Sequence, residues 1–146
     1  MKIAIVDDER PSRSELRHLI CEAFADAEVM EASCGEEAME LFLKEDFDLI
    51  FMDINLGDMD GTTLAAMAKK AQPNVEIVFA TAYNSYAEKA FDIDALNYIL
   101  KPFDSKRIEQ TLQRYMKKQS KHSYMREMWK EEEKTTISKI SINSDK

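Results

Sequence analysis

The strongest constraint on the fold of this chain is a regular alternation between short apolar runs and amphipathic stretches. The apolar runs predict buried strands at residues 3–6, 28–32, 49–52, 75–80 and 97–100. Between and after these runs, apolar residues recur at helical spacing. They predict helices that begin near residue 11, cover 36–44, 62–71 and 85–91, and begin again near residue 104. Five strands therefore alternate with five helices.

Strand and helix alternation of this kind predicts right-handed βαβ crossovers and a parallel sheet covered on both faces. We expect an α/β fold, a five-stranded doubly wound parallel sheet of order 2-1-3-4-5. In that order the crevice at the switch point lies between the carboxyl ends of the first and third strands. Asp7, Asp8 and Asp53 follow these two strands directly, so three carboxylates are expected to converge there.

Length and composition fit one globular domain followed by a tail. The chain has 146 residues, 45% of them hydrophobic, with three Gly and three Pro, which is not the composition of a disordered segment. No apolar run approaches the roughly 20 residues that span a bilayer, and no signal-peptide pattern precedes the first strand. We expect no membrane association and a cytoplasmic location. Cys21 and Cys34 lack metal-site spacing and are assigned no function.

Charge is unevenly distributed along the chain. The net charge is −8, yet residues 117–146 carry eight basic and five acidic side chains. The acidic excess therefore lies in the globular part, which should repel nucleic acid. DNA binding is expected only from the basic tail or from sequence beyond Lys146.

Three carboxylates close together repel one another and commonly recruit a cation. Oxygen ligands without His or Cys favour Mg²⁺. An Asp carboxylate can act as a nucleophile toward a phosphoryl group if a metal and fixed donors stabilise the developing charge. Thr81 and Lys101 end the fourth and follow the fifth strand, at the same sheet edge as Asp53, and are candidate donors.

Several motifs in this order and spacing resemble the receiver domain of bacterial two-component response regulators, over about residues 1–119. The motifs are Ile5-Val6-Asp7-Asp8-Glu9, Phe51-Met52-Asp53, Met59-Asp60-Gly61, Ala80-Thr81-Ala82 and Leu100-Lys101-Pro102-Phe103. The resemblance implies a flavodoxin-like or CheY-like fold, with Asp53 as phosphoacceptor for a sensor histidine kinase. The chain would then be no enzyme toward free substrates, with only self-catalysed phosphoryl transfer and autodephosphorylation.

The resemblance also implies further roles. The Asn55 backbone carbonyl would join Asp7, Asp8 and Asp53 as a Mg²⁺ ligand, and Thr81 and Lys101 would contact the phosphoryl oxygens. Tyr98 would be the switch aromatic that moves with Thr81, and Pro102 would follow a cis peptide bond. Gly57 departs from the family, in which proline is common at this position.

The segments 82–87 and 95–98 resemble the subgroup whose output is a LytTR-type DNA-binding domain. The predicted organisation is a receiver over 1–119, a linker over 120–135 and, at 136–146, the start of an effector domain that this chain lacks. The Ile/Ser/Lys alternation at 136–142 predicts a strand. By analogy, activation would cause homodimerisation through the face between the fourth strand and the fifth helix, carrying Tyr86, Ala95 and Ile108.

Two other functions share parts of this pattern. Asp58 and Asp60 lie in a D-x-D-G-T sequence like the nucleophile motif of haloacid-dehalogenase-type phosphatases, but the preceding strand delivers Asp53 instead. A flavodoxin-like redox domain shares the sheet, yet Asp7, Asp8 and Glu9 would repel the phosphate of FMN.

Overall fold

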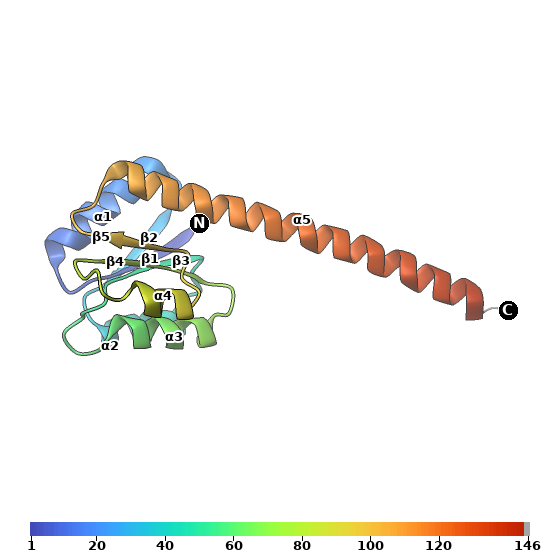
Figure 1. Cartoon of the computed structure of the whole chain (residues 1–146), viewed down its shortest axis with the longest axis horizontal. Helices are drawn as coiled ribbons and strands as arrows, with labels where there is room; N and C mark the ends of the chain where they lie inside the picture. Colours follow the sequence, from blue (N-terminus) through green and yellow to red (C-terminus); the bar gives the residue numbers. More distant parts are fainter. Residues whose placement is uncertain (145–146) are drawn as a thin grey trace. The chain divides into compact units, whose positions relative to one another are not determined.

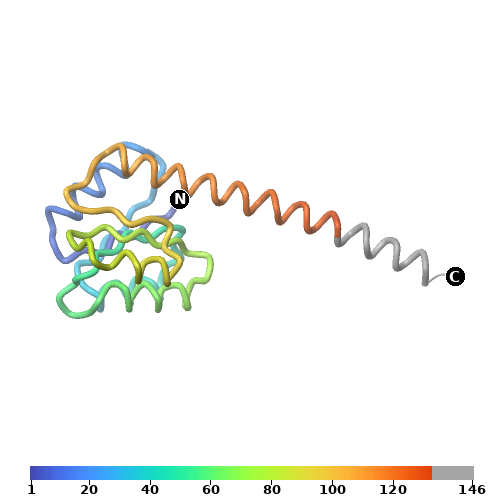
Figure 2. Tube along the Cα trace, viewed as in Figure 1, coloured from blue at the N-terminus to red at the C-terminus, as the bar shows by residue number. Residues whose placement is uncertain are grey.

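A computed structural model describes the backbone of residues 1–144 and the side chains of residues 1–132 (Figures 1 and 2). The chain divides into two compact units, Met1–Leu112 and Gln113–Lys146. The first unit contains the whole sheet, and the described backbone of the second, residues 113–144, continues the last helix.

The sheet confirms the predicted topology. Its five strands pair in parallel in the order β2-β1-β3-β4-β5. The strands are β1 (Lys2–Val6), β2 (Glu28–Ala32), β3 (Leu49–Met52), β4 (Glu76–Thr81) and β5 (Asn97–Leu100). β3 and β4 are buried along their whole length, as expected for central strands covered on both faces.

Helices cover both faces of the sheet in the first unit (Figure 1). They are α1 (Arg10–Ala23), α2 (Gly35–Lys44), α3 (Gly61–Ala71), α4 (Ala87–Asp92) and α5 (Ser105–Ser144). Helices α2, α3 and α4 lie on one face, where they share the core cluster with the sheet; α1 and the first turns of α5 lie on the other. The predicted helix at 85–91 begins two residues later than expected, with Tyr86 as its N-cap residue.

Local sequence explains where several helices begin and end. Pro11 lies in the first turn of α1, where its missing N–H costs no hydrogen bond. Asp60 caps α3 by accepting a hydrogen bond from the Thr62 N–H at 2.7 Å. At the C-terminal end of α2, the Gln72 side chain donates hydrogen bonds to the carbonyls of Phe42 and Glu45 and accepts one from the Phe47 N–H. These side chains hold the loops that surround the sheet edge.

The strand predicted at 136–142 is wrong, because α5 continues through these residues to Ser144. A helix satisfies its backbone hydrogen bonds within its own segment, whereas a lone strand needs a partner that this chain does not offer there. The segment 120–135 is likewise helical. The assignment of 120–135 as a linker and of 136–146 as the start of an effector domain stays a prediction. Among the described helices, none is both long and apolar enough to cross a membrane.

Candidate functional site

Strand register brings the predicted carboxylates together. Val6 and Met52 are partners in the β1–β3 ladder, so Asp7 and Asp53 leave neighbouring strands at the same level. The ladder continues one step further, because the Asp53 N–H donates to the Val6 carbonyl at 2.9 Å. Carboxylate oxygens of Asp7, Asp8 and Asp53 lie within 4.8 Å of one another. Asp7 and Asp53 are buried and Asp8 is exposed, which leaves the cluster open on one side.

Lys101 reaches this cluster from the far side of β4. Thr81 and Leu100 are partners in the β4–β5 ladder, and the Lys101 N–H donates to the Thr81 carbonyl at 2.8 Å. The Lys101–Pro102 peptide bond is cis, as predicted. The Lys101 ammonium lies 2.8 Å from Asp7 Oδ2 and 3.0 Å from Asp53 Oδ2. One cation therefore bridges the two buried carboxylates.

The electrostatics of the site follow from burial and this bridge. Burial raises the pKa of Asp7 above its ordinary value, and the hydrogen bond from Lys101 offsets only part of that rise. For Lys101 burial acts in the opposite direction, but its hydrogen bonds to Asp7 and Asp53 outweigh burial and raise its pKa. The lysine is thus held in its charged form at neutral pH, beside an acid whose ionisation is costly.

Backbone groups hold both carboxylates in place. Asp53 Oδ1 accepts a hydrogen bond from the Ile54 N–H at 2.7 Å, and Asp7 Oδ1 accepts one from the Glu9 N–H at 2.9 Å. The Arg13 guanidinium donates to the Asp7 carbonyl at 2.7 Å. Sequence reasoning did not assign Arg13 to the site, because a helix-surface arginine gives no signal of where its side chain reaches.

Gly61 is a second residue that sequence reasoning did not assign to the site. A Cβ at this position would lie 1.9 Å from the Asp53 carbonyl oxygen, and the Gly61 N–H donates to the Ile54 carbonyl at 2.6 Å. The start of α3 is therefore packed directly on the backbone of Asp53. The sequence gives one indication of this close approach: Gly61 follows Asp60 at the predicted start of a helix, where a glycine allows backbone to pack on backbone.

Thr81 is the last residue of β4, and Tyr98 is the second residue of β5, paired with Phe79. Thr81 is fully buried, and its Oγ1 accepts a hydrogen bond from the Tyr83 N–H at 3.3 Å. The Tyr98 hydroxyl donates to the Tyr83 carbonyl, and its ring lies 6.2 Å from that of Phe79 between centroids. Burial raises the pKa of the Tyr98 hydroxyl. Both predicted switch residues are thus tied to Tyr83.

The backbone conformation of the loop after Asp53 explains why Gly57 stands where proline is common in the family. Gly57 has φ of 82°, a left-handed conformation that proline cannot adopt because its ring fixes φ near about −65°. The Asn55 side chain accepts a hydrogen bond from the Gly57 N–H and donates to the Tyr83 hydroxyl at 3.2 Å. The Asn55 side chain thereby links this loop to the residue after β4.

The carboxylates of the phosphatase-like motif serve as helix caps. Asp58 accepts hydrogen bonds from the N–H groups of Gly35 and Glu36 at the start of α2, at 2.8 and 3.0 Å. Asp60 caps α3 and also accepts from the Thr62 hydroxyl at 2.6 Å. Neither belongs to the Asp7–Asp8–Asp53 cluster. The phosphatase alternative therefore loses the residues that carried it.

The prediction that Ile108 lies on the exposed dimer face is wrong. Ile108 is fully buried and cannot contact a second copy, because its side chain packs into the domain. Tyr86 and Ala95 are partly exposed, and Phe91 and Leu100 are 85% and 45% exposed on α4 and β5. The most exposed large apolar side chains of α4 and β5 are therefore Phe91 and Leu100.

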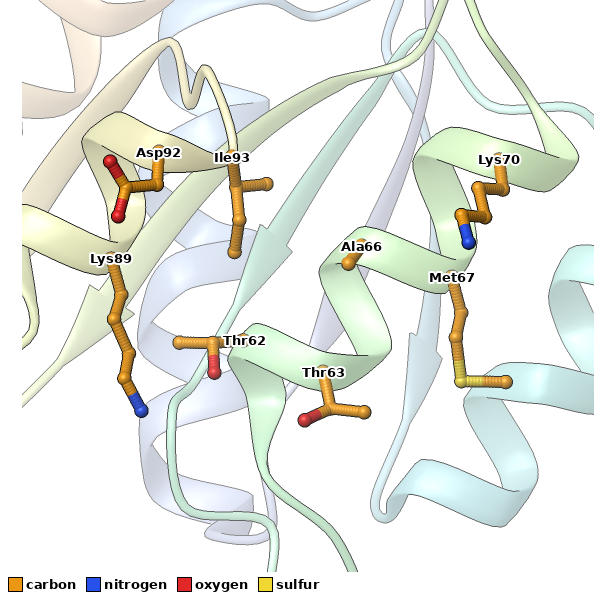
Figure 3. A pocket seen from close by; sticks show the side chains of 8 residues that line it. All are labelled: Thr62, Thr63, Ala66, Met67, Lys70, Lys89, Asp92 and Ile93. Carbon is orange, nitrogen blue, oxygen red and sulfur yellow. The ribbon is translucent and has the colours of Figure 1, made fainter.

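A hollow of about 390 Å³ between α3 and α4 lies apart from this chemistry (Figure 3). Side chains of Thr62, Met67 and Lys70 line it from α3, and Lys89 and Asp92 line it from α4. None of the clustered carboxylates borders it. The candidate functional site is instead the acidic cluster at the strand ends.

The acidic crevice fits a hard divalent cation. Its ligands are carboxylate oxygens, two of them on buried residues held by backbone N–H groups, and the exposed Asp8 leaves room for water. Mg²⁺ prefers such oxygen ligands and usually retains part of its hydration shell. The crevice is thus compatible with Mg²⁺, and Asp7, Asp8 and Asp53 are the residues that would hold it.

Comparisons with known proteins agree with this fold. The sequence matches the response regulator receiver domain over residues 3–113. It is 44% identical over 128 residues to the sensory transduction protein LytT of Bacillus anthracis, covering 87% of this chain and 52% of that protein. The response regulatory domain of mrkE from Klebsiella pneumoniae superposes with a TM-score of 0.77 at 33% identity, covering 83% of this chain and 99% of that one.

A third similar structure is of a response regulator from Burkholderia pseudomallei with a phosphorylated aspartic acid, calcium ion and citrate. It has a TM-score of 0.69 and 27% identity, covering 85% of this chain and 74% of that one.

A doubly wound sheet with an acidic crevice at its switch point and a lysine across it defines a response-regulator type of domain. The chain belongs to the response regulator receiver domain family. Its curated relatives include several proteins named LytT or LytR, which is the subgroup indicated by the sequence. The chain spans about half the length of the curated relatives it matches.

Proposed function

We propose that Asp53 is the phosphoacceptor of a two-component signalling switch. The observation that carries this proposal is the arrangement around Asp53: a buried carboxylate within a three-carboxylate cluster, bridged to Asp7 by the Lys101 ammonium. The similar structure from Burkholderia pseudomallei, which contains a phosphorylated aspartic acid and a calcium ion, supports the same chemistry.

The reaction is a transfer of a phosphoryl group from a phosphohistidine of a sensor kinase. A carboxylate oxygen of Asp53 forms a bond to phosphorus while the phosphorus–nitrogen bond breaks, and the imidazole leaves and takes up a proton. Ile54 already orients the nucleophile through the hydrogen bond from its N–H to Asp53 Oδ1. The Lys101 ammonium, now 3.0 Å from Asp53 Oδ2, would follow the negative charge onto the phosphoryl oxygens.

Mg²⁺ held by Asp7, Asp8, Asp53 and the Asn55 backbone carbonyl would neutralise charge on the phosphoryl oxygens. Asp7 and Lys101 then have separate tasks. Asp7, fixed by the Glu9 N–H and by Arg13 on its carbonyl, presents a ligand oxygen in a constant position. Lys101 would supply a second positive charge beside Asp53.

The switch would work through Thr81 and Tyr98. The dianionic phosphoryl group draws the Thr81 hydroxyl toward it, which breaks the hydrogen bond that Thr81 Oγ1 accepts from Tyr83. The Tyr98 hydroxyl donates a hydrogen bond to the Tyr83 carbonyl, so movement of Tyr83 would release Tyr98 to turn inward. The exposed face between β4 and α5 changes as a result, and homodimerisation through this face would follow.

The output would be control of transcription through a LytTR-type DNA-binding domain joined to the receiver. The names of the relatives, sensory transduction protein LytT and transcriptional regulatory protein LytR, support this assignment. Contact with DNA would come from that domain, since the whole acidic excess of the chain lies in residues 1–116. The cytoplasmic location remains the prediction made from the sequence.

The test is intact mass after incubation with acetyl phosphate and Mg²⁺. The wild-type chain should gain about 80 Da, the mass of one phosphoryl group. Asp53→Ala should gain nothing, and chelation of Mg²⁺ should abolish the gain in the wild type.

Asp58→Ala is the matched control, because it removes a carboxylate of the same loop that caps α2. It should be phosphorylated like the wild type. An adduct that requires Asp58 and not Asp53 would refute the proposal and restore the phosphatase-like alternative.

A further inference from the structure

Four large apolar side chains are exposed together on the helix that forms the second unit. Tyr124, Met125, Met128 and Trp129 are 67, 50, 50 and 70% exposed. The helix runs without interruption through this stretch (Figure 2). We call these four residues the α5 patch. Grouped aromatic and methionine side chains of this size are more typical of an interaction surface than of a solvated helix.

The four side chains share one side of the helix. At 3.6 residues per turn they fall within an arc of about 140°. The opposite side at the same level carries Arg126, Glu127 and Lys130, all exposed. The stretch is therefore amphipathic over a short length, which is the pattern of a helix that packs its apolar side against a neighbour.

Charged residues of opposite sign border the α5 patch on the same arc. Lys121 lies one turn before Tyr124, and Glu132 lies one turn after Met128. Lys117 extends the positive side by one further turn. The surface thus runs from positive through apolar to negative along the helix.

We infer that the α5 patch pairs with the α5 patch of a second copy of this chain in an antiparallel orientation. With the two helices crossing between residues 126 and 127, Tyr124 of one copy lies opposite Trp129 of the other, and Met125 lies opposite Met128. The same register places Lys121 opposite Glu132 twice, once on each side of the symmetry axis. A parallel pairing in register would instead place Lys121 against Lys121 and Glu132 against Glu132, which is repulsive.

This association is expected to be weak and reversible. Only four exposed apolar side chains per copy would become buried in the dimer, and they cover less area than a standard stable interface. Each exposed ion pair adds a modest stabilisation, and the two pairs act mainly by selecting the orientation. The pairing needs neither Asp53 nor a phosphoryl group, so it is separate from the proposed activation of the receiver.

Sedimentation equilibrium over a concentration series up to about 500 µM tests the pairing. The wild-type chain and Asp53→Ala should show the same monomer–dimer equilibrium without acetyl phosphate. Trp129 is the single tryptophan of the chain, so its fluorescence should shift to shorter wavelength as the dimer forms. A chain that stays monomeric over the whole series would overturn the inference.

Charge exchange tests the orientation. Lys121→Glu and Glu132→Lys should each raise the dimer dissociation constant about tenfold, because each replaces two attractive pairs by two repulsive ones. The double variant Lys121→Glu/Glu132→Lys should return close to the wild-type value. Lys130→Glu makes the same charge change on the opposite side of the helix and should have little effect.

All of these variants change exposed residues, and circular dichroism should show the same helix content in each. Single variants that dimerise as well as Lys130→Glu would overturn the pairing across the α5 patch. A double variant no better than either single variant would overturn the antiparallel orientation. If a different partner covers the patch, such as another domain joined to this chain, the chain alone should stay monomeric in these experiments.

Discussion

At the scale of single residues, the site depends on one lysine whose ammonium bridges two buried carboxylates. The Lys101 side chain is 14% exposed, and its ammonium contacts both Asp7 and Asp53. Removing one partner of a buried charged cluster leaves the others without compensation, and this costs more than the original interaction contributed. Lys101 should therefore matter to the stability of the fold as well as to its chemistry.

We expect Lys101→Met to lower the free energy of unfolding by about 1–3 kcal/mol in metal-free buffer at pH 7. Mg²⁺ should restore more stability to this variant than to the wild type, because a cation among the carboxylates replaces the lost ammonium charge. Urea unfolding with chelator and with Mg²⁺ measures both effects. Lys106→Met, which changes an exposed lysine of α5, is the control. Equal stability of the two variants would contradict the role given to Lys101.

Gly61 is required for a different reason, the close approach of α3 to the Asp53 backbone. Gly61→Ala should lower the free energy of unfolding by about 1–3 kcal/mol or more, since its Cβ would overlap the Asp53 carbonyl oxygen at 1.9 Å. The rate of phosphorylation should fall as Asp53 is displaced. Thermal unfolding and phosphorylation by acetyl phosphate measure the two effects.

Gly57→Ala provides the comparison, because nothing lies within 4 Å of its Cβ position and only its φ of 82° is unfavourable. It should cost about 1 kcal/mol. A Gly61→Ala variant that is no less stable than Gly57→Ala would show that α3 moves away without cost.

At the scale of elements, side chains from distant loops hold both ends of α2. At the C-terminal end of α2, the Gln72 side chain donates hydrogen bonds to the carbonyls of Phe42 and Glu45. It also accepts a hydrogen bond from the Phe47 N–H. Gln72→Ala should lower the free energy of unfolding by about 2 kcal/mol, because three partly buried backbone groups lose their partners. Chemical denaturation measures the loss, and Gln110→Ala on the exposed side of α5 should change stability by less than about 0.5 kcal/mol. Equal effects of the two substitutions would contradict this assignment.

The N-terminal end of α2 is held by the Asp58 carboxylate, which makes its contribution depend on pH. Hydrogen bonds from the N–H groups of Gly35 and Glu36 lower the pKa of Asp58 below its ordinary value of 3.8. A lowered pKa in the folded state stabilises the fold above pH 3.8, and this stabilisation is lost as the pH falls through the lowered value.

Asp58→Ala should therefore be less stable than the wild type at pH 7, and the difference should shrink as the pH falls below about 3.8. Urea midpoints across this pH range measure it, with Asp26→Ala in an exposed turn as the control. A difference that stays constant with pH would mean that the Asp58 charge has no part in capping α2.

The same elements show how far sequence reasoning reaches. Strand order and the meeting of Asp7, Asp8 and Asp53 could be predicted, because apolar runs define strands and parallel strands bring their carboxyl ends to one edge. The contacts of Arg13 and Gln72 could not, since they depend on side-chain reach across loops. The burial of Ile108 was missed because a single residue on a helix gives no register. The predicted strand at 136–142 failed because alternation alone does not supply a partner strand.

At the scale of the whole molecule, the proposed switch predicts a dimer that depends on phosphorylation. Acetyl phosphate with Mg²⁺ should double the mass of the chain in solution, through the face that carries Phe91 and Leu100. Phe91→Glu should prevent this doubling, because a charge in the interface core would have to be desolvated. Light scattering measures the mass in solution. All chains should carry Lys121→Glu, which weakens pairing through the α5 patch, so that only the phosphorylation-dependent dimer is observed.

Leu43→Glu is the matched control, because Leu43 is 84% exposed and belongs to α2, outside α4 and β5. It should dimerise like its parent chain. A mass that does not change on phosphorylation, or changes equally in the two variants, would contradict dimerisation through the α4–β5 surface.

The central claim is that the phosphoryl group resides on Asp53, and chemical marking of that residue tests it most directly. Borohydride reduces an acyl phosphate to an alcohol, which converts a phosphorylated aspartate to homoserine and lowers its residue mass by about 14 Da. After acetyl phosphate and Mg²⁺ treatment, fragmentation of the peptide that contains residues 53–60 should place this change at Asp53 and leave Asp58 and Asp60 unmodified. A change at Asp58, or at no residue of a chain that had gained the phosphoryl mass, would contradict the assignment of Asp53 as the acceptor.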